Sequence, residues 1–335
     1  MKVKYKQAHS QKKIFADNYT LVTGIFLIVV PFILNSLVFT IILNHMKIAI
    51  ASGKGGTGKT TLSVNLYRVL SQKFNNNVQL IDCDVEEPNA ALFFPNLKLV
   101  EEKQVFTPVP EIDAEQCTFC KKCANWCEFN AISIIPKLSF AEINSDLCHS
   151  CGACLEACQN NAISEKNEPL GTINSFKNNF GVGIVEGRLE IGSAMQTALI
   201  KKVKQIAENN VAITLYDAPP GTSCPVIETI ADTDYILLIT EPTPFGLNDL
   251  KIAIELISEL KIPFGVIVNK AGIGNNDVYD FLEENNIELI AKLPFSKNYA
   301  TQYSNGNLLE DIPFEIDEIY QKIAKKIIDK VPAKL

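Results

Sequence analysis

A phosphate-binding loop is the strongest chemical signal in this sequence. Residues 53–60 read Gly-Lys-Gly-Gly-Thr-Gly-Lys-Thr and satisfy the pattern G-x-x-x-x-G-K-[ST]. In such a loop backbone N–H groups surround an anion, the lysine reaches the β- and γ-phosphates, and the next hydroxyl holds Mg²⁺. We therefore predict an ATP site in which Lys59 contacts the phosphates and Thr60 the Mg²⁺. Its loop residues are Gly53, Lys54, Gly55, Gly56, Thr57, Gly58, Lys59, Thr60 and Thr61.

Eight of the ten cysteines form two runs with the same spacing, C-x2-C-x2-C-x3-C. This is the spacing of bacterial two-cluster ferredoxins, in which the fourth cysteine of each run binds the other [4Fe–4S] cluster. The expected ligands are Cys117, Cys120, Cys123 and Cys158 for cluster 1, and Cys148, Cys151, Cys154 and Cys127 for cluster 2. Structural zinc is the alternative, but it prefers two C-x-x-C pairs separated by a longer loop. The proline usual after each fourth cysteine is replaced by Glu128 and Gln159, which affects local geometry more than cluster binding.

The second lysine of the loop, Lys54, makes the motif more specific. The run KGGTGKT resembles the deviant Walker A motif of the MinD/ParA, Mrp and nitrogenase-iron-protein superfamily. The resemblance implies that Lys54 crosses a dimer interface to the nucleotide of the partner. We therefore expect an ATP-dependent homodimer, or a heterodimer with a paralogue.

Two further strands are predicted to end in carboxylates. The strand 78–84 ends in Asp82-Cys83-Asp84, which resembles the switch I end of MinD-like ATPases, and Asp84 is the candidate that positions the attacking water. The strand 211–216 leads to Asp217-Ala-Pro-Pro-Gly221, which resembles the Walker B and switch II segment. The resemblance implies that Asp217 contacts Mg²⁺ through water and that Gly221 senses the γ-phosphate. It also places Asn269, Lys270 and Pro294 near the adenine.

Cys224 follows Asp217 by seven residues, an offset similar to that of a cluster-ligating cysteine in the nitrogenase iron protein. A bridging cluster would need a second cysteine from each subunit, and residues 181–191 contain none. We therefore expect Cys224 to pack in the switch segment. Cys83 is expected to be a small buried hydrophobic residue.

Strands and helices alternate around these motifs. Apolar runs at 48–51, 78–84, 181–186, 211–216, 235–240, 265–269 and 288–293 read as strands, and helical patterns follow at 192–206, 247–260 and 277–284. This alternation predicts a doubly wound, mostly parallel α/β sheet of the MinD-like P-loop type. A last amphipathic helix is expected to cover the sheet, with a lipid-binding tail as the alternative, and its apolar face carries Ile316, Ile319, Ile323 and Ile327.

The cysteine runs interrupt this pattern. We expect residues 106–167 to form an inserted α+β ferredoxin domain, with the Pro-containing stretch 106–110 as its boundary. Residues 46–105 and 168–335 then form the two parts of the ATPase. The whole pattern resembles MinD-superfamily ATPases that contain an inserted ferredoxin domain.

Residues 1–45 do not fit this scheme. The uncharged apolar segment 20–43 would span about 36 Å as a helix, enough for a bilayer. The five lysines before it would keep the N-terminus inside and export the ATPase away from ATP. We therefore interpret residues 1–45 as an over-extended start, with Met46 as the native one. The alternative is a membrane anchor with the ATPase facing the cytoplasm.

Composition limits the partners. The chain has a net charge of −7, and because residues 1–45 carry five lysines and one aspartate, the remainder has a net charge of −11. An acidic body argues against nucleic acid as the main partner. Clustered cysteines together with an ATP site indicate a reducing cytoplasm.

Three functions are open from the sequence. The first couples nucleotide state to electron transfer by the two clusters, towards a redox partner. The second is assembly or delivery of iron–sulfur clusters in the manner of Mrp, although the C-terminal C-x-x-C of that group is absent. The third is a MinD-like positioning ATPase with redox-sensing clusters.

Overall fold

The computed structural model describes residues 45–177, 183–207 and 211–330. The prediction for residues 1–45 therefore lies outside the described residues, apart from His45, and the predicted strand 181–186 lies partly outside them. Within the described ranges no helix is both long and apolar enough to cross a membrane. The strands are β1 (Met46–Ala51), β2 (Val78–Asp82), β3 (Lys98–Ile112), β4 (Ile132–Ile135), β5 (Phe140–Ile143), β6 (Ile163–Lys177), β7 (Ile184–Leu189), β8 (Ile213–Asp217), β9 (Tyr235–Thr240), β10 (Phe264–Ala271) and β11 (Leu289–Pro294).

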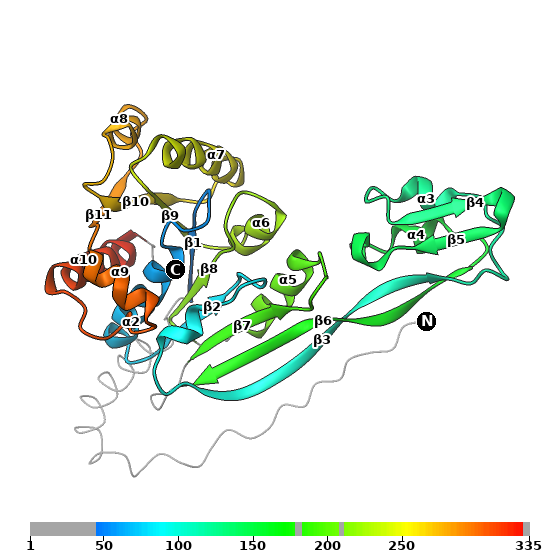
Figure 1. The fold of residues 1–335 in the computed structure, drawn as a ribbon, viewed down its shortest axis with the longest axis horizontal. Coiled ribbons are helices and arrows are strands. Elements are labelled where there is room, and N and C mark those ends of the chain that lie inside the picture. The colour runs from blue at the N-terminus through cyan, green and yellow to red at the C-terminus, as the bar shows by residue number, and fades with distance from the viewer. Residues whose placement is uncertain (1–44, 178–182, 208–210, 331–335) are drawn as a thin grey trace, which may run out of the picture. The chain divides into compact units, whose positions relative to one another are not determined.

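Nine of these strands form one sheet in the order β11-β10-β9-β1-β8-β2-β7-β6-β3 (Figure 1). The pairs from β11 to β7 are parallel, and β6 and β3 add an antiparallel edge. The expected α/β fold with a mostly parallel sheet is confirmed. β1 lies at the centre of the sheet, so its last residues deliver the phosphate-binding loop to the middle of the carboxyl edge.

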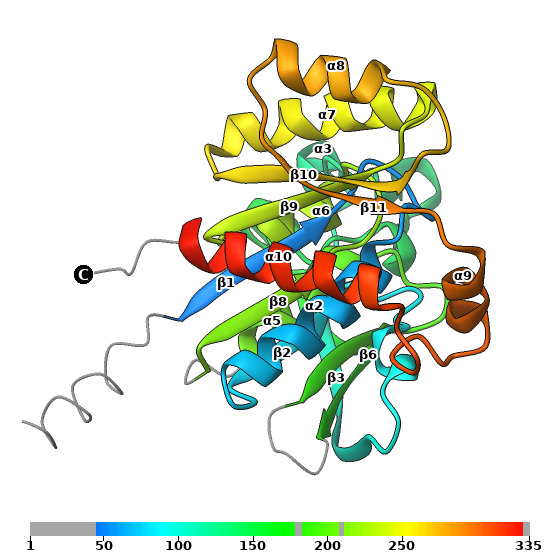
Figure 2. The ribbon, with the colours of Figure 1, turned by 90° about the vertical axis from the view of Figure 1, so that its left-hand side faces the viewer.

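Helices cover both faces of the sheet, because each face carries its own apolar core. α2 (Lys59–Lys73), α9 (Lys297–Ser304) and α10 (Phe314–Lys330) pack on one face, where Figure 2 shows α10 crossing beside α2. α5 (Gln196–Ile206), α6 (Cys224–Ile230), α7 (Pro244–Leu260) and α8 (Asp277–Glu284) pack on the other. α10 buries Ile316, Tyr320, Ile323 and Ile327, in agreement with the expectation that it covers the sheet.

A long hairpin carries the eight clustered cysteines. β3 and β6 are fifteen-residue antiparallel strands paired from Lys98 with Lys177 to Ile112 with Ile163. Between their far ends lie α3 (Lys122–Trp126), the β4–β5 hairpin and α4 (Ala153–Ala157), which we call the cysteine unit. The expected boundary at 106–110 falls inside β3, because an edge strand tolerates Pro108 and Pro110.

Most elements lie where the sequence patterns indicate. β9 and α8 match their predicted ranges, and α7 begins three residues before its prediction, at Pro244. α5 begins four residues after the predicted Gly192, because residues 191–195 form a turn before Gln196.

Candidate functional site

The phosphate-binding loop joins the buried end of β1 to the first turn of α2. Gly58 has φ 97°, in the left-handed region, and a Cβ there would lie 2.4 Å from Nδ2 of Asn269. Asn269 at the end of β10 uses this Nδ2 to donate a 2.8 Å hydrogen bond to the Thr57 carbonyl. Glycine is therefore required at position 58 for two reasons: the left-handed backbone favours it, and a larger residue would collide with the side chain of Asn269. The loop is held in its conformation by a side chain from a distant strand.

Lys59 is the first residue of α2 and is only 7% exposed. Burial lowers its pKa, while the charges of Asp217, Asp84 and Asp82 act in the opposite direction. The three predicted charged residues Lys59, Asp84 and Asp217 therefore lie close enough to interact. A buried lysine facing carboxylates is an arrangement that suits phosphate and a divalent cation.

Asp217 ends β8 and has an exposed fraction of 1%. Within the described part of the chain, neither of its carboxylate oxygens has a hydrogen-bond partner. The pKa of Asp217 is raised to about 6, mainly by burial, and the nearby charge of Lys59 acts in the opposite direction. A buried carboxylate without a partner is costly. The site therefore fits a cation such as Mg²⁺ between Asp217 and Thr60.

The two carboxylates after β2 have different surroundings. Asp82 is buried and accepts hydrogen bonds from the backbone N–H groups of Asp84, Asn89 and Ala90, at 2.9–3.0 Å. It fixes the loop that follows. Asp84 is half-buried and lines a cavity beside the phosphate-binding loop, and burial raises its pKa. Of the pair, Asp84 is the one that can reach a bound ligand. Cys83 between them is fully buried, as expected.

A cavity of about 390 Å³ opens beside the phosphate-binding loop. Its walls include many of the predicted residues, namely Gly55, Gly56, Gly58, Lys59, Thr60, Thr61, Asp84, Asn269, Lys270 and Pro294. Sequence reasoning missed Tyr299 and Tyr303 of α9 and Tyr320 of α10, which also line it. These tyrosines come from the last helices, whose amphipathic pattern indicates only packing.

Several predicted residues do not line this cavity. Gly53, Lys54, Thr57, Asp217 and Gly221 lie outside its wall. Lys54 is directed instead to Glu241 at the end of β9, with 3.5 Å between its Nζ and Oε2. Glu241 also accepts a hydrogen bond from Lys270. In this structure, Lys54 is therefore paired with a carboxylate of its own chain.

The predicted switch II segment is tied to the loop before the phosphates. The N–H of Gly221 donates a 3.1 Å hydrogen bond to the Ser52 carbonyl, and Gly221 has φ 97°. Cys224, the first residue of α6, is exposed rather than packed. The prediction of a packed thiol is therefore wrong, because the helix begins at the surface.

The eight clustered cysteines line two cavities. The first cysteine cavity contains Cys117, Cys120, Cys123 and Cys158 in its wall. The second cysteine cavity contains Cys127, Cys148, Cys151 and Cys154. Each cavity thus takes three cysteines from one run and the fourth from the other, which is the division that the spacing predicts. Cys120 and Cys151 hold the same position in the two runs, and both are exposed. Cys123 and Cys154 also hold matching positions, and both are buried.

The surroundings of the sulfur atoms repeat between the two runs. The N–H groups of Phe119 and Ser150 each lie 3.4 Å from the sulfur of the cysteine two residues earlier. Both residues have left-handed backbones, with φ 53° and 50°. Burial, and to a smaller extent the neighbouring thiols of Cys148 and Cys151, raise the pKa of Cys154 to about 11. Thiolates packed so closely need positive charge, which iron would supply.

A single metal ion is a different case. Among the described residues, no group of three or more His, Cys, Asp or Glu side chains converges closely enough to hold one ion. A four-iron cube takes one thiolate per iron, so its four ligands surround a cavity rather than a point. Two cavities walled by four cysteines each, with N–H groups directed at sulfur, fit that donor set.

Comparisons with known proteins bear on the nucleotide-binding part of the chain. The profile of the CobQ/CobB/MinD/ParA nucleotide binding domain matches residues 48–309. The uncharacterized protein MJ0578 of Methanocaldococcus jannaschii is 35% identical over 84% of this chain and 98% of its own. An iron-sulfur cluster carrier protein of the same organism is 24% identical over 86% of both chains. The cell division ATPase MinD of Pyrococcus furiosus shares the fold, with a TM-score of 0.51 at 18% identity over 85% of this chain and 98% of that one.

Proposed function

Because the chain belongs to the CobQ/CobB/MinD/ParA family of nucleotide-binding ATPases, we propose that its nucleotide state controls electron transfer by two [4Fe–4S] clusters in the cysteine unit. The observation that carries this proposal is a series of direct contacts from the switch II segment to the turn that holds Cys148. The expected partner is a redox protein that accepts or donates single electrons.

ATP occupies the cavity at the carboxyl edge of the sheet. The loop N–H groups and Lys59 hold its phosphates, and Asn269, Lys270 and Pro294 lie towards the base. Mg²⁺, when bound by Thr60 and Asp217, supplies charge that stabilises the transferred phosphoryl group. Asp84 orients a water whose oxygen bonds to the γ-phosphorus as the bond to the β–γ bridging oxygen breaks. Gly221 reports the loss of the γ-phosphate.

Lys54 links hydrolysis to dimerisation. In the isolated chain it pairs with Glu241, and both side chains are partly buried. For Lys54 to reach the nucleotide of a second subunit it must leave Glu241. Dimerisation therefore exchanges one ion pair for contact with phosphate, which carries more negative charge and favours the exchange only when ATP is present.

The proposed clusters would occupy the two cysteine cavities. Cys117, Cys120, Cys123 and Cys158 would hold one, and Cys148, Cys151, Cys154 and Cys127 the other. The N–H groups of Phe119 and Ser150 would donate to coordinated sulfur, and such hydrogen bonds tune reduction potentials. Bound iron supplies one-electron chemistry, which the side chains of this unit cannot supply themselves.

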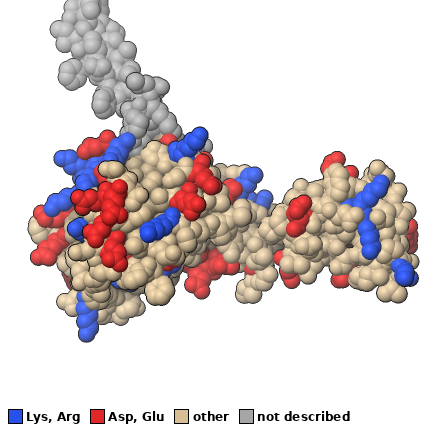
Figure 3. All heavy atoms as spheres, turned by 90° about the horizontal axis from the view of Figure 1, so that it is seen from above, with Lys and Arg blue, Asp and Glu red and all other residues tan. Residues whose placement is uncertain are grey.

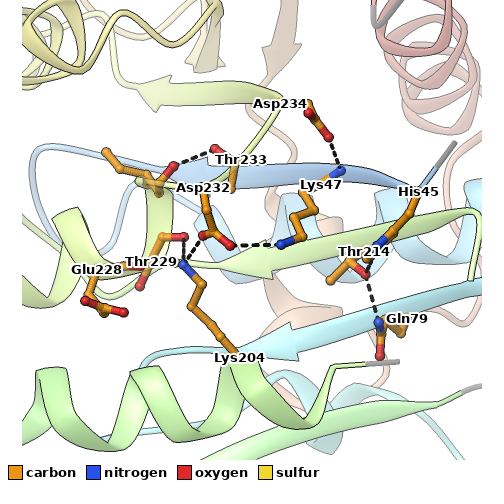
Figure 4. A network of polar contacts seen from close by, with 11 residues as sticks. His45, Lys47, Gln79, Lys204, Thr214, Glu228, Thr229, Asp232, Thr233 and Asp234 are labelled. Atoms are coloured by element: carbon orange, nitrogen blue, oxygen red, sulfur yellow. Dashed lines mark hydrogen bonds and ion pairs between the residues drawn. The ribbon is translucent and has the colours of Figure 1, made fainter. Parts of the chain in front are cut away.

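Lys204 connects α6 to α5. Its ammonium group donates to the carbonyls of Glu228 and Thr229 at the end of α6, and to the carboxylate of Asp232 (Figure 4). Asp232 also pairs with Lys47 of β1, at 2.8 Å. Lys204 has a side-chain exposure of only 9%. Because α6 follows directly on the switch II segment, a shift at Gly221 would be passed through Lys204 to α5.

The start of α5 reaches the cysteine unit. Ser150, which lies between Cys148 and Cys151, directs its hydroxyl to the sulfur of Met195, 3.7 Å away. The same hydroxyl lies 3.2 Å from that of Thr107 in β3. Met195 is buried and directly precedes α5. Movement of α5 would therefore change the position of Ser150, whose N–H is directed at the sulfur of Cys148 in the second cysteine cavity.

A second set of contacts starts from the loop after β2. The Val85 carbonyl accepts a 2.8 Å hydrogen bond from the N–H of Leu189, and Arg188 reaches the Pro88 carbonyl. Both partners belong to β7, which pairs with β6, the strand that leads out of the cysteine unit. Both predicted switch segments are therefore in contact with elements that support the cysteines.

The test is a reductive titration of anaerobic protein in the ADP state and with a non-hydrolysable ATP analogue. We expect the potentials or the partner affinity to differ, and a ten-fold preference corresponds to about 1.4 kcal/mol. Lys204→Met should remove the difference, whereas the matched control Lys202→Met on the same helix should keep it. Identical potentials and identical partner affinity in both nucleotide states would refute the coupling.

A second candidate function is cluster delivery. The likeness to the iron-sulfur cluster carrier protein favours it, together with the exposure of Cys120 and Cys151, one in each cavity. Exposed ligands are open to thiol exchange with an acceptor. Transfer of iron and sulfide to an apo-ferredoxin in the presence of a chelator would support delivery. Clusters that survive repeated reduction and oxidation without transfer would support electron transfer.

A further inference from the structure

The two cysteine cavities are related by the internal repeat, so their walls can be compared position by position. In the two runs, Thr118 corresponds to His149 and Lys122 to Ala153. Asn160, two residues after Cys158, corresponds to Phe129, two residues after Cys127. All six side chains line the cavity of their own set of cysteines. At each of the three positions the two cavities differ in chemistry.

Each cavity is bordered by a pair of side chains that come from different runs. At the first cysteine cavity, Nδ2 of Asn160 donates a 2.7 Å hydrogen bond to the hydroxyl of Thr118. At the second, the rings of Phe129 and His149 stack with centroids 3.8 Å apart and an interplanar angle of 13°. The first cavity thus has a polar border and the second an aromatic one.

The charge at the third position differs as well. Lys122 lines the first cavity and donates a hydrogen bond to the Gln159 side chain, which directly follows Cys158. This contact places the ammonium group of Lys122 next to the residue that follows Cys158. Ala153 at the matching position in the second cavity carries no charge. The carboxylate of Glu165 lies close enough to act electrostatically on Cys148 of that second cavity.

These differences between the cavities change how strongly each one stabilises a reduced cluster. Reduction adds one negative charge to a cluster, and nearby positive charge, oriented dipoles and solvent access stabilise the reduced form. Lys122 and the hydroxyl and amide of Thr118 and Asn160 supply such groups at the first cavity. At the second cavity Ala153 and Phe129 supply no charge and no hydrogen-bonding group, and the His149 ring is stacked on Phe129.

We propose that the two cavities hold clusters of unequal reduction potential, and that the first electron from a one-electron donor resides in the cavity of Cys117, Cys120, Cys123 and Cys158. The step adds one electron to that cluster and removes one from the donor, with no bond made or broken and no proton moved. The inference rests on the proposed cluster binding.

The test is an anaerobic titration with titanium(III) citrate, followed by electron paramagnetic resonance. We expect two reduction steps, and a ten-fold preference for the first cavity corresponds to 59 mV. The cavity is assigned with the matched exposed cysteines. Cys120→Ser should alter the signal of the first electron, and Cys151→Ser should alter only that of the second.

Variants of the lining residues give an independent measurement. Lys122→Ala should lower the higher potential and leave the lower one in place. Lys121→Ala is the control, because this neighbouring lysine is exposed and does not line the cavity. Exchange of the residues at all three positions between the two cavities should reverse the order of the two reduction potentials. If that exchanged protein fails to load iron, the comparison of Lys122→Ala with Lys121→Ala still tests whether the first cavity has the higher potential.

The outcomes separate this inference from the proposed function. Loaded protein with two equal potentials that Lys122→Ala leaves unchanged would overturn the inference and leave cluster binding intact. A first electron whose signal responds to Cys151→Ser alone would overturn it too. Protein that takes up no iron under anaerobic reconstitution would instead refute the proposed function.

Discussion

The nucleotide end of the sheet and the cysteine unit differ in what holds them together. The loop around Gly58 is fixed by Asn269, by the buried strand β1 and by apolar cores on both faces of the sheet. The buried core of the cysteine unit consists of Cys123, Ile132, Ile134, Cys154, Ala157 and Ile163. Two of these six residues are proposed iron ligands. We therefore expect the first region to keep its shape without a ligand and the second to depend on the proposed clusters.

The surfaces differ less. Over the face drawn in Figure 3, Lys and Arg are interspersed with Asp and Glu on both the sheet and the cysteine unit. The interiors differ more clearly, because the sheet buries large aliphatic side chains on both faces, whereas the small core of the cysteine unit combines three isoleucines with the sulfur atoms of Cys123 and Cys154. Four predictions test this comparison.

Removal of iron should have the largest effect. We expect about eight iron and eight labile sulfide per chain from two Cys₄-ligated cubes. Replacing Cys117 and Cys151 together should abolish both cluster signals and the hydrogen-exchange protection of residues 117–158, while β1 and α2 stay protected. Zinc without absorption near 400 nm in anaerobic protein, or full protection without metal, would contradict the comparison.

Loss of Lys59 should impair the nucleotide site and leave the clusters unchanged, which is the opposite of the effect of iron removal. Lys59→Ala removes the buried cation that faces the phosphates and should abolish ATP binding, measured by calorimetry, with iron content unchanged. Lys54→Ala is the matched variant, because this lysine lies outside the cavity. It should retain ATP binding but lose ATP-dependent dimerisation and turnover. Dimerisation of Lys54→Ala at the normal level would exclude a role across the interface.

Asp217 gives a pH-dependent test. Its pKa is about 6 in the folded chain and near 3.8 when unfolded, so between these values the folded state binds more protons. Stability of the Mg²⁺-free protein should therefore fall as pH rises from about 4 to about 6. Asp217→Asn should remove this slope and stabilise that form by about 1–3 kcal/mol at pH 7, because a buried charge without a partner is lost. Thermal unfolding across this range measures both effects, and an unchanged slope would disprove the assignment.

The smallest effect should come from the side chain that fixes the loop. Asn269→Ala removes the hydrogen bond to Thr57 and should weaken ATP binding by about 1 kcal/mol, without change in fold. Asn285→Ala is the control, since Asn285 makes a similar bond to the Phe281 carbonyl at the far end of α8. Equal ATP affinities of the two variants would show that the loop is held by other contacts.

The sequence predicts the two regions unequally. The phosphate-binding loop and the cysteine runs are local patterns, so their residues are found from spacing alone, and the division of the cysteines between two cavities follows from the repeat. Tyr299, Tyr303 and Tyr320 line the nucleotide cavity through packing of the last helices on the sheet, and no local pattern indicates this. Glu241 pairs with Lys54 across nearly two hundred residues, which only the strand order determines.

The Pro108 and Pro110 pair has a consequence for self-association. β3 is one of the two edge strands of the nine-stranded sheet, and its exposed length carries Glu101, Glu102 and Lys103. Prolines and charges on an edge strand discourage other strands from adding to it, because they remove N–H donors and bury charge in any continuous sheet. The hairpin that extends the sheet to the cysteines is thus also protected against aggregation. A concentrated, cluster-free preparation should resist fibril formation at this edge, and replacing both prolines and the three charged residues with threonine should weaken that resistance.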